Sequence, residues 1–184
     1  MTGLDRAVEL VREGDLDHVP AFRDQVLAFC ADHPDALLRT CEAAHLTGSA
    51  LVVDPADGRF VLLHHRKVGR WLQPGGHADG DGDLAAVALK EAQEETGIDG
   101  LVVRLPAVDI DVHEFRAPGE PSHLHLDLRF VVAAPAGTAA AGSPPGNPES
   151  IAIRWVAEDE LDQLDVDEST RRLVQRGLAT LHRP

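Results

Sequence analysis

The sequence predicts an α/β fold in which helices pack on a β-sheet, preceded by an N-terminal helical segment. Segments with apolar residues at helical spacing lie between segments in which apolar and polar residues alternate, and such mixing in one compact chain indicates a layered α/β architecture. Of the 184 residues, 43% are hydrophobic and 26% are charged, as in ordinary globular proteins. This length suits about one domain with a sizeable core.

Helical patterns dominate the first part of the chain. A short helix is expected over residues 7–11, and residues 22–44 are typical of two helices with a break at residues 32–34. Pro34 suits the first turn of the second of these helices, which we expect to run to about residue 45.

Thr47-Gly48 marks the expected boundary between an N-terminal helical extension, residues 1–47, packed on the domain, and a main domain, residues 48–184. Residues 55–58, Pro-Ala-Asp-Gly, predict the turn of a β-hairpin. Strands are expected over residues 49–54, 59–65, 101–104, 108–115, 123–133 and 151–156.

Three helices are expected in the main domain, over residues 84–96, 158–164 and 168–181. Gly97 suits the position just after the first of them. Loops are expected over residues 116–122 and 134–148, and they contain no readable code for a substrate.

Composition excludes several classes of protein. With 31 acidic against 17 basic residues the net charge is −14, so a basic stripe for stable duplex nucleic acid is not expected. No apolar run approaches the roughly 18 residues of a membrane span. The two cysteines, without a secretory signal, predict a reduced, cytoplasmic protein. A small anionic substrate remains compatible with the acidic balance because a divalent cation inverts the local field. The sequence has no code for the oligomeric state, and a homodimer is compatible with it.

The expected helix at residues 84–96 carries a cluster of carboxylates. Glu91, Glu94 and Glu95 fall within roughly 100° of arc, on the border of the apolar stripe. Clustered anions at a buried border repel one another, and a hard divalent cation such as Mg²⁺ or Mn²⁺ resolves the conflict. The alternative is a solvated acidic helix face.

The same stretch resembles the Nudix hydrolase superfamily, whose box reads G-x5-E-x7-R-E-U-x-E-E-x-G-U, with U aliphatic. The matching residues are Gly76, Glu91, Glu94, Glu95, Gly97 and Ile98, with Ala92 at the first aliphatic position. The approach to the box, residues 71–76, is also similar, as is Arg154-Trp155 with the segment after it. Two positions depart from the box: Gly82 stands where the first acid is usual, and Lys90 stands where arginine is usual.

The resemblance implies a Nudix-like α/β/α sandwich with a mixed β-sheet over the main domain, and hydrolysis of a diphosphate bond in a nucleoside diphosphate linked to another moiety. It implies Mg²⁺ or Mn²⁺ held by Glu91, Glu94 and Glu95 with a backbone carbonyl at Gly76 or its neighbour Gly75, and a catalytic set of these glutamates with Lys90. Lysine offers only a point charge where arginine offers a planar fork, and Gly82 supplies no carboxylate, so we expect impaired rather than abolished turnover.

Two other functions share this resemblance. A Nudix-like nucleotide-binding or sensor domain with weak or no turnover is favoured by Gly82 and Lys90 and opposed by the three intact glutamates. An enzyme similar to isopentenyl-diphosphate isomerase is favoured by the strand histidines and opposed by the lack of a cysteine near the box.

Basic and histidine side chains next to the box are candidates for binding the substrate. Arg66, Lys67 and Arg70 form a basic cluster that suits distal phosphates, with a solvated turn as the alternative. His77 directly follows the glycine pair and is expected to line the site. Glu149 is a candidate base, with a solvated loop glutamate as the alternative.

Two expected strands, residues 108–115 and 123–133, each place polar side chains on one face. If the strands pair antiparallel with these faces aligned, three cross-strand pairs form: His113 with His125, Asp111 with Asp127, and Asp109 with Arg129. His125 and Asp127 are therefore candidates for binding substrate or a second cation beside the glutamates. The alternative is an exposed polar sheet face.

Overall fold

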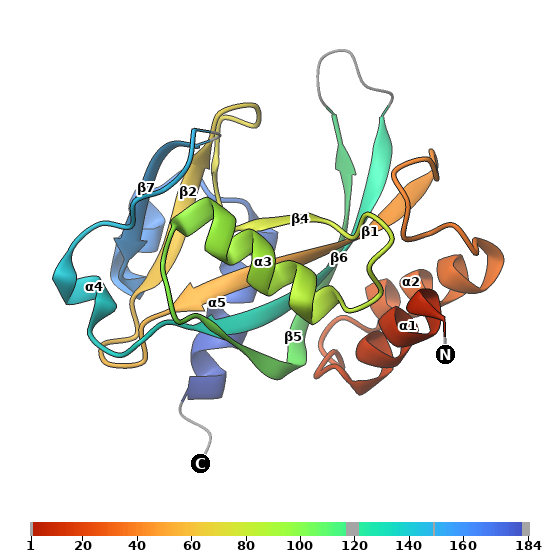
Figure 1. The fold of residues 1–184 in the computed structure, drawn as a ribbon, viewed down its shortest axis with the longest axis horizontal. Helices are drawn as coiled ribbons and strands as arrows, with labels where there is room; N and C mark the ends of the chain where they lie inside the picture. Colours follow the sequence, from red (N-terminus) through yellow and green to blue (C-terminus); the bar gives the residue numbers. More distant parts are fainter. Residues whose placement is uncertain (1, 117–121, 149, 182–184) are drawn as a thin grey trace.

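The computed structural model describes residues 2–116, 122–148 and 150–181. Its centre is a seven-stranded mixed sheet with the order β3-β2-β1-β6-β5, in which β4 also pairs with β1 and β7 with β2. Strand β6 runs parallel to β1 and antiparallel to β5 (Figure 1). The strands are β1 Ala44–Val53, β2 Phe60–His65, β3 Trp71–Leu72, β4 Gly75–His77, β5 Val102–Phe115, β6 His123–Ala133 and β7 Ser150–Val156.

Helices lie on both sides of this sheet, as the expected α/β/α arrangement requires. Helix α3 crosses the front of the sheet in Figure 1 and α5 lies behind it, while α1 and α2 pack at the side where β1 begins. The helices are α1 Gly3–Glu13, α2 Pro20–Asp32, α3 Leu84–Thr96, the short α4 Thr138–Ala141, the 3-10 helix η1 Glu158–Gln163 and α5 Glu168–Leu181. None of the described helices combines the length and apolarity that crossing a membrane needs.

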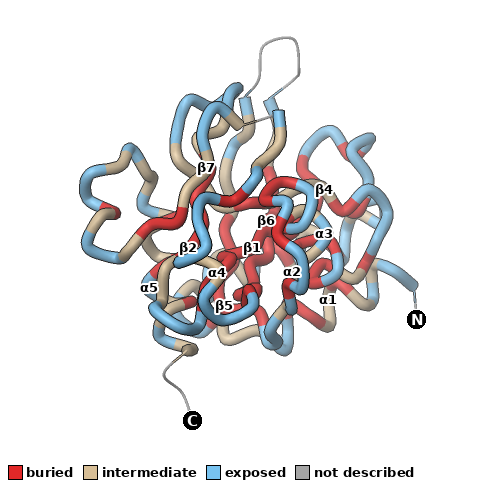
Figure 2. Tube along the Cα trace, turned by 60° about the vertical axis from the view of Figure 1, so that its left-hand side comes forward, coloured by how far each residue is buried: buried red, intermediate tan, exposed pale blue. Residues whose placement is uncertain are grey.

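Strand β1 is the centre of the core, and Figure 2 shows it buried along its length together with β6. Two glycines allow helices to approach it closely. A Cβ at Gly48 would lie 2.6 Å from the Leu84 carbonyl oxygen of α3, and one at Gly177 of α5 would lie 2.4 Å from Leu51 Cδ2. Gly48 is therefore a packing position within β1, and β1 begins at Ala44 rather than at residue 49.

The helix expected over residues 34–45 is absent from the structure, and this prediction is wrong. Short turns occupy residues 34–40, and two backbone carbonyls there accept hydrogen bonds from outside the turns. The Ala36 carbonyl accepts from the Leu46 N–H, and the Leu37 carbonyl accepts from the Gly80 N–H. These long-range bonds use acceptors that a helix would have used internally, so tertiary contacts override the local pattern.

Most other expected elements are confirmed. Helix α3 spans Leu84–Thr96 and ends at Gly97, whose φ of +68° suits glycine, and α5 spans Glu168–Leu181. The two strands expected over residues 101–115 form the single strand β5, with a register shift between Arg104 and Asp109. The helix expected over residues 158–164 is the 3-10 helix η1, and the loop expected over residues 134–148 contains the short helix α4. Residues 117–121 of one expected loop, and Glu149, lie outside the described residues.

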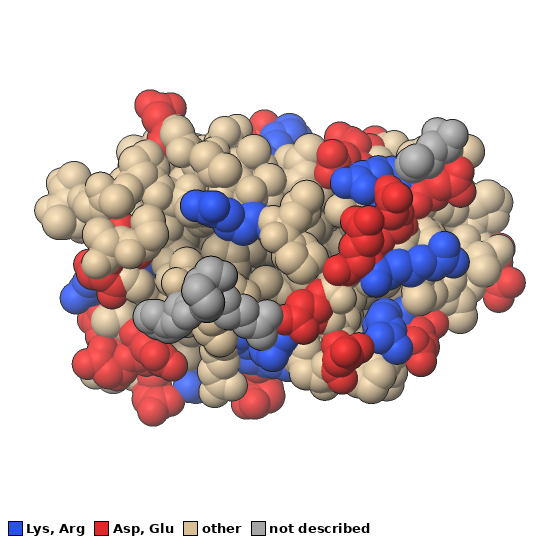
Figure 3. Space-filling model, turned by 90° about the horizontal axis from the view of Figure 1, so that it is seen from below, with Lys and Arg blue, Asp and Glu red and all other residues tan. Residues whose placement is uncertain are grey.

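The N-terminal helices contact the rest of the chain at several points. Asp15 donates its backbone N–H to the Ala107 carbonyl and its carboxylate pairs with Arg176 of α5 at 2.9 Å. Figure 3 shows acidic and basic side chains interspersed on this side of the molecule rather than separated into one patch. The division of the chain at residues 47 and 48 into an extension and a domain stays a prediction.

Candidate active site

A cavity of about 660 Å³ opens between α3, the β4 strand and the odd-numbered face of β1, β6 and β5. Its size lies within the range of pockets that bind small molecules. The residues lining it include Glu91, Glu95, Gly75, Gly76, His77, His113, His125, Asp127, Arg129, Lys67 and Arg70. Residues from both halves of the sequence therefore line the same cavity.

On the α3 side, two glutamates contact the glycine pair. A Cβ added to Gly76 would lie 2.4 Å from Glu91 Cδ, so the carboxylate occupies the space that a side chain would fill. Glu95, which is 7% exposed, accepts a 2.9 Å hydrogen bond from the Gly75 N–H. Two carboxylates beside the backbone of the glycine pair form an oxygen-rich donor set of the kind that Mg²⁺ prefers. The residues present therefore fit a hard divalent cation.

Glu94 and Lys90 lie on the outer side of α3. The Lys90 ammonium is 3.6 Å from Glu91 Oε1 and 3.7 Å from Glu94 Oε1, and the Lys90 and Glu94 side chains are 64% and 57% exposed. Neither residue lines the cavity. The structure thus brings Glu91 and Glu95 together with the glycine pair and leaves Glu94 at the rim.

Gly82, the first departure from the box, has a packing cause. A Cβ at this position would lie 1.8 Å from the Gly3 carbonyl oxygen of α1. The N-terminal helix therefore occupies the space that a side chain at position 82 would need. A carboxylate at this position is incompatible with the way that α1 packs.

The expected pairing of the polar strand faces is confirmed. In the antiparallel β5–β6 ladder His113 lies opposite His125, Asp111 opposite Asp127 and Asp109 opposite Arg129. The parallel β1–β6 ladder adds a third column that sequence reasoning missed, because β1 places His45 beside His125, Thr47 beside Asp127 and Ser49 beside Arg129. A three-by-three array of polar side chains results, and it lies on the cavity side of the sheet.

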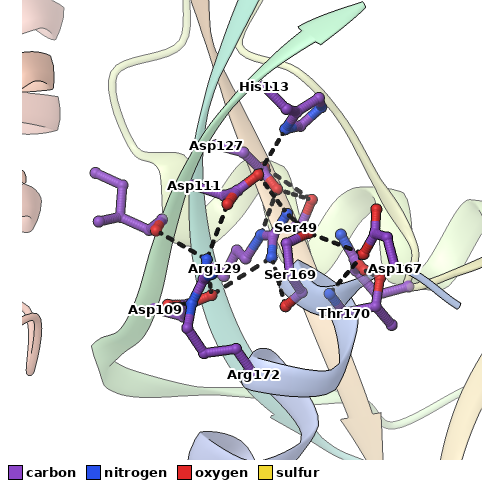
Figure 4. A network of polar contacts seen from close by, with 12 residues as sticks. Ser49, Asp109, Asp111, His113, Asp127, Arg129, Asp167, Ser169, Thr170 and Arg172 are labelled. Atoms are coloured by element: carbon purple, nitrogen blue, oxygen red, sulfur yellow. Dashed lines mark hydrogen bonds and ion pairs between the residues drawn. The ribbon is translucent and has the colours of Figure 1, made fainter. Parts of the chain in front are cut away.

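At the buried end of this array, Asp127 is held by several donors (Figure 4). Its carboxylate accepts from the Thr47 hydroxyl at 2.8 Å, from the Ser49 hydroxyl at 2.8 and 3.0 Å, and from Arg129 Nε at 2.7 Å. An anion so fully hydrogen-bonded is suited to fixing neighbouring side chains rather than to receiving a phosphate. Asp127 faces the same cavity as Glu91 and Glu95.

Arg129 and Arg172 neutralise the remaining carboxylates of the array. Arg129, which is 1% exposed, lies 3.4 Å from both Asp109 and Asp111, and Arg172 of α5 contacts the same two residues at 2.9 and 2.8 Å. Burial opposes ionisation of Asp111, but His113, Arg129 and Arg172 outweigh it and hold the pKa of this carboxyl below its usual range. His18 joins Asp109 at 3.0 Å from the N-terminal segment.

At the opposite end of the array, histidines gather. Ligand nitrogens of His45, His77, His123 and His125 all lie within 4.8 Å of one another. Burial lowers the pKa of His77 to about 4 and that of His125 to about 2, with nearby positive charges and histidines acting in the same direction. The imidazoles of His77 and His125 are therefore neutral near pH 7.

The predicted basic cluster is only partly at the cavity. Lys67 and Arg70 line it, while Arg66 does not. Arg39 and Arg116, which sequence reasoning missed, also line it. Arg39 makes a bidentate pair with Asp79, at 2.6 and 2.8 Å. Several largely exposed cationic side chains therefore line the same cavity as the glutamates.

The sequence contained a signal for the missed β1 residues. His45, Thr47 and Ser49 alternate with Leu46, Gly48 and Ala50, which is the period of a strand with one polar face. The incorrect helix over residues 34–45 and the boundary placed at Thr47-Gly48 hid this alternation. Arg172 and Ser169, which contact Arg129 or its partners, carried no such signal because α5 is distant in sequence.

Comparisons with known proteins agree with this arrangement. The NUDIX domain family model matches residues 44–177. The phosphatase NudJ of Escherichia coli K12 is 30% identical over 121 residues, which cover 65% of this chain and 72% of NudJ.

Solved structures share the fold. An Ap4A hydrolase from C. elegans matches with a TM-score of 0.57 at 16% identity, over 74% of this chain and 96% of the hydrolase. The Nudix hydrolase RenU from M. smegmatis matches with a TM-score of 0.52 at 22% identity, over 72% of this chain and 82% of RenU. The E. coli dihydroneopterin triphosphate pyrophosphohydrolase matches with a TM-score of 0.55 at 17% identity, over 73% and 95%.

Proposed function

This chain belongs to the NUDIX family of pyrophosphate-cleaving hydrolases, and we propose that it hydrolyses a diphosphate bond in a nucleoside diphosphate linked to another moiety, with Mg²⁺ or Mn²⁺ as cofactor. The observation that carries the proposal is the convergence of Glu91, Glu95 and the Gly75-Gly76 backbone on a cavity that cationic side chains also line. A cavity of about 660 Å³ has room for a nucleotide-sized ligand.

In the proposed site, Glu91 and Glu95 hold the cation together with the Gly76 carbonyl, and Glu94 contributes from the rim. The Gly75 N–H fixes the Glu95 carboxylate, and the contact between Gly76 and Glu91 fixes the second ligand. When bound, a divalent cation neutralises negative charge on the phosphoryl oxygens as the anhydride bond breaks. Lys90, beside Glu91 and Glu94, moderates the repulsion between these carboxylates.

Other residues in the proposal attract the phosphates of the substrate or shape the wall of its cavity. Lys67 and Arg70 line the cavity and are placed to attract phosphates, with Arg66 contributing charge from outside the cavity. His77 and His125 line the same wall, and the Phe115 ring stacks on His125 with centroids 4.7 Å apart. Asp127 acts as a positioning residue for Arg129 and the β1 hydroxyls.

The proposal is tested by a substrate screen with the full chain. The panel contains nucleoside triphosphates, nucleoside diphosphate sugars and dinucleoside polyphosphates, together with Ap4A and dihydroneopterin triphosphate, the compounds that the names of two structural neighbours contain. Each compound is incubated with Mg²⁺ or Mn²⁺ and products are read by mass. Glu95→Gln is the matched control, because it removes one charge without changing side-chain size.

We expect a pair of phosphorylated products from at least one compound, and no turnover after chelation of the metal. Tight binding of a nucleotide without cleavage would favour the sensor alternative. Rearrangement of a prenyl diphosphate without cleavage would favour the isomerase alternative. Cleavage that persists undiminished in Glu95→Gln would contradict the proposed site.

A further inference from the structure

Four histidines from three strands meet beside the cavity, and two of them, His77 and His125, line it. His45 belongs to β1, His77 ends β4, and His123 and His125 begin β6, and one ring nitrogen of each lies within 4.8 Å of the others. Backbone pairing sets this convergence, since His45 lies beside His125 in the parallel ladder and His77 lies opposite Thr47. The arrangement therefore depends on the centre of the sheet.

We propose that His45, His77, His123 and His125 form a metal site for a divalent transition-metal ion of the Zn²⁺ type, separate from the glutamates of α3. Four imidazole nitrogens favour borderline ions such as Zn²⁺ over Mg²⁺, which takes oxygen ligands. The bound ion stabilises β4 against β1 and β6, and so fixes the Gly75–His77 strand on which Glu91 and Glu95 rest.

Interatomic distances in the cluster suit such an ion. The Nε2 atoms of His123 and His125 are 3.1 Å apart. Two nitrogens bound to one tetrahedral Zn²⁺ at about 2.0–2.1 Å would lie roughly 3.3 Å apart, close to the observed separation. The two imidazoles therefore need little movement to share a cation.

His45 supplies an independent observation. His45 is 3% exposed, and its buried Nε2 has no hydrogen-bond partner among the residues that the structure describes. Its Nδ1 lies 3.4 Å from the Cys41 carbonyl oxygen, to which it donates in the tautomer that leaves a lone pair on Nε2. Metal-binding histidines use their second nitrogen in this way, and an unsatisfied buried nitrogen is costly without a ligand.

The surroundings are compatible with added positive charge. Arg39 is the cation whose charge acts on His77 and His45, and its guanidinium is paired with Asp79. His113 lies next to His125, with ring centroids 5.4 Å apart, but its Nδ1 bonds to Asp111 at 2.9 Å and it is outside the group of converging nitrogens. It is therefore a matched control for a nearby imidazole that is not a ligand.

The test titrates the chelator-treated full chain with Co²⁺ and then Zn²⁺. Tetrahedral nitrogen coordination gives Co²⁺ strong visible absorption, and displacement by Zn²⁺ removes it. We expect one equivalent of Co²⁺ with these bands in the wild type, and affinity at least about tenfold lower in His77→Gln and His123→Gln. His113→Gln, and Glu91→Gln with Glu95→Gln, should retain the wild-type affinity and spectrum.

The proposal would be overturned if the wild type binds no Co²⁺, or binds it without the absorption bands of tetrahedral coordination. This outcome is measured on the wild type alone. An equal loss of affinity in His113→Gln would overturn the ligand set. Loss in the glutamate variants alone would place the ion at the α3 site instead. Circular dichroism and melting temperature of each apo-protein are measured alongside, so that a loss of binding in a folded variant is distinguished from unfolding.

Discussion

Two groups of carboxylates, one on the sheet and one on α3, each contribute to the cavity lining and differ in how their charge is balanced. Asp109, Asp111 and Asp127 of the sheet are buried against the guanidinium groups of Arg129 and Arg172, at distances of 2.7–3.4 Å. On α3, the Lys90 ammonium is largely exposed and stays 3.6–3.7 Å from Glu91 and Glu94.

This difference separates the roles of the two groups. Arginine side chains of the protein itself form ion pairs and hydrogen bonds with the carboxylates of the sheet. The sheet group, called the carboxylate floor below, is therefore fixed in place and orients its neighbours. A single exposed ammonium screens negative charge weakly, so the α3 group retains a field that attracts a cation. The structure therefore combines sheet carboxylates that are neutralised by the protein's own arginines with α3 glutamates that are suited to binding a metal ion.

The largest expected effect is on stability and comes from removing the central cation of the floor. Arg129→Met should lower the free energy of unfolding by about 3–5 kcal/mol, because it removes the arginine partner of buried Asp127 and leaves Asp109 and Asp111 with Arg172 as their arginine partner. Urea unfolding measures it. The matched control is Arg172→Met, which removes a partly exposed arginine and should cost clearly less; equal losses would show that the two arginines are equivalent.

The next effect is on turnover. Glu91→Gln and Glu95→Gln should each lower kcat by about 10³-fold, since the loss of a metal ligand removes several kcal/mol of transition-state stabilisation. Glu94→Gln, at the exposed rim, should lower it by about tenfold or less. The measurement is steady-state kinetics on the substrate found in the screen. A greater loss in Glu94→Gln than in Glu91→Gln would reverse the proposed ranking.

Gly82→Ala tests why the α3 group has no acid in the preceding turn. The added methyl collides with the Gly3 backbone of α1, so we expect a loss of about 1–3 kcal/mol of stability, typical of overpacking. Thermal unfolding measures it. Gly3→Ala is the control, because the atom nearest to its added Cβ is a leucine side-chain atom at 3.3 Å, so it should cost less stability than Gly82→Ala. Gly80→Ala is unsuitable as a control because φ at that position is +92°. Unchanged stability in Gly82→Ala would refute the packing explanation.

A pH series separates the histidine end of the array from its carboxylate floor. The pKa of His77 is about 4 in the folded protein, below its value of about 6.5 in the unfolded chain. The neutral ring therefore contributes fully to the free energy of unfolding above about pH 6.5, and this contribution is lost as the pH falls toward 4. Asp111 also has a lowered pKa, so its contribution is full above about pH 4 and is lost only at lower pH.

Urea unfolding of the chelator-treated protein from pH 8 to 3 measures both windows. His77→Gln should make the profile shallower between about pH 6.5 and 4 by the slope of one proton, while His125, whose pKa is also lowered, keeps part of the slope there and the decline at lower pH remains. A profile that falls equally in both windows with and without His77 would argue against this separation.

The smallest expected effect is that of Lys90→Arg. A planar fork reaches Glu91 and Glu94 with better geometry than an ammonium at 3.6–3.7 Å, so turnover should stay equal or rise by less than about tenfold. Kinetics at low and high salt measure it, because an exposed pair is screened by salt. A fall in kcat with unchanged stability would mean that the site is adapted to lysine.

The sequence by itself determined the parts whose chemistry is local. The spacing of Glu91, Glu94 and Glu95 on one helix, and the alternation along residues 108–115 and 123–133, follow from helix and strand periodicity alone. For this reason the end of α3 at Gly97 and the three cross-strand pairs were predictable before any coordinates were known.

Only the tertiary structure decided the parts that depend on distant segments. Residues 34–40 form turns because their carbonyls bond to Leu46 and Gly80, and Gly82 is a glycine because α1 packs on it. The parallel pairing of β1 with β6 brings His45 and Ser49 into the array, and α5 supplies Arg172. Local propensity is worth tenths of a kcal/mol per residue, whereas these long-range contacts bury side chains and backbone groups together, so they override the local pattern and complete the site.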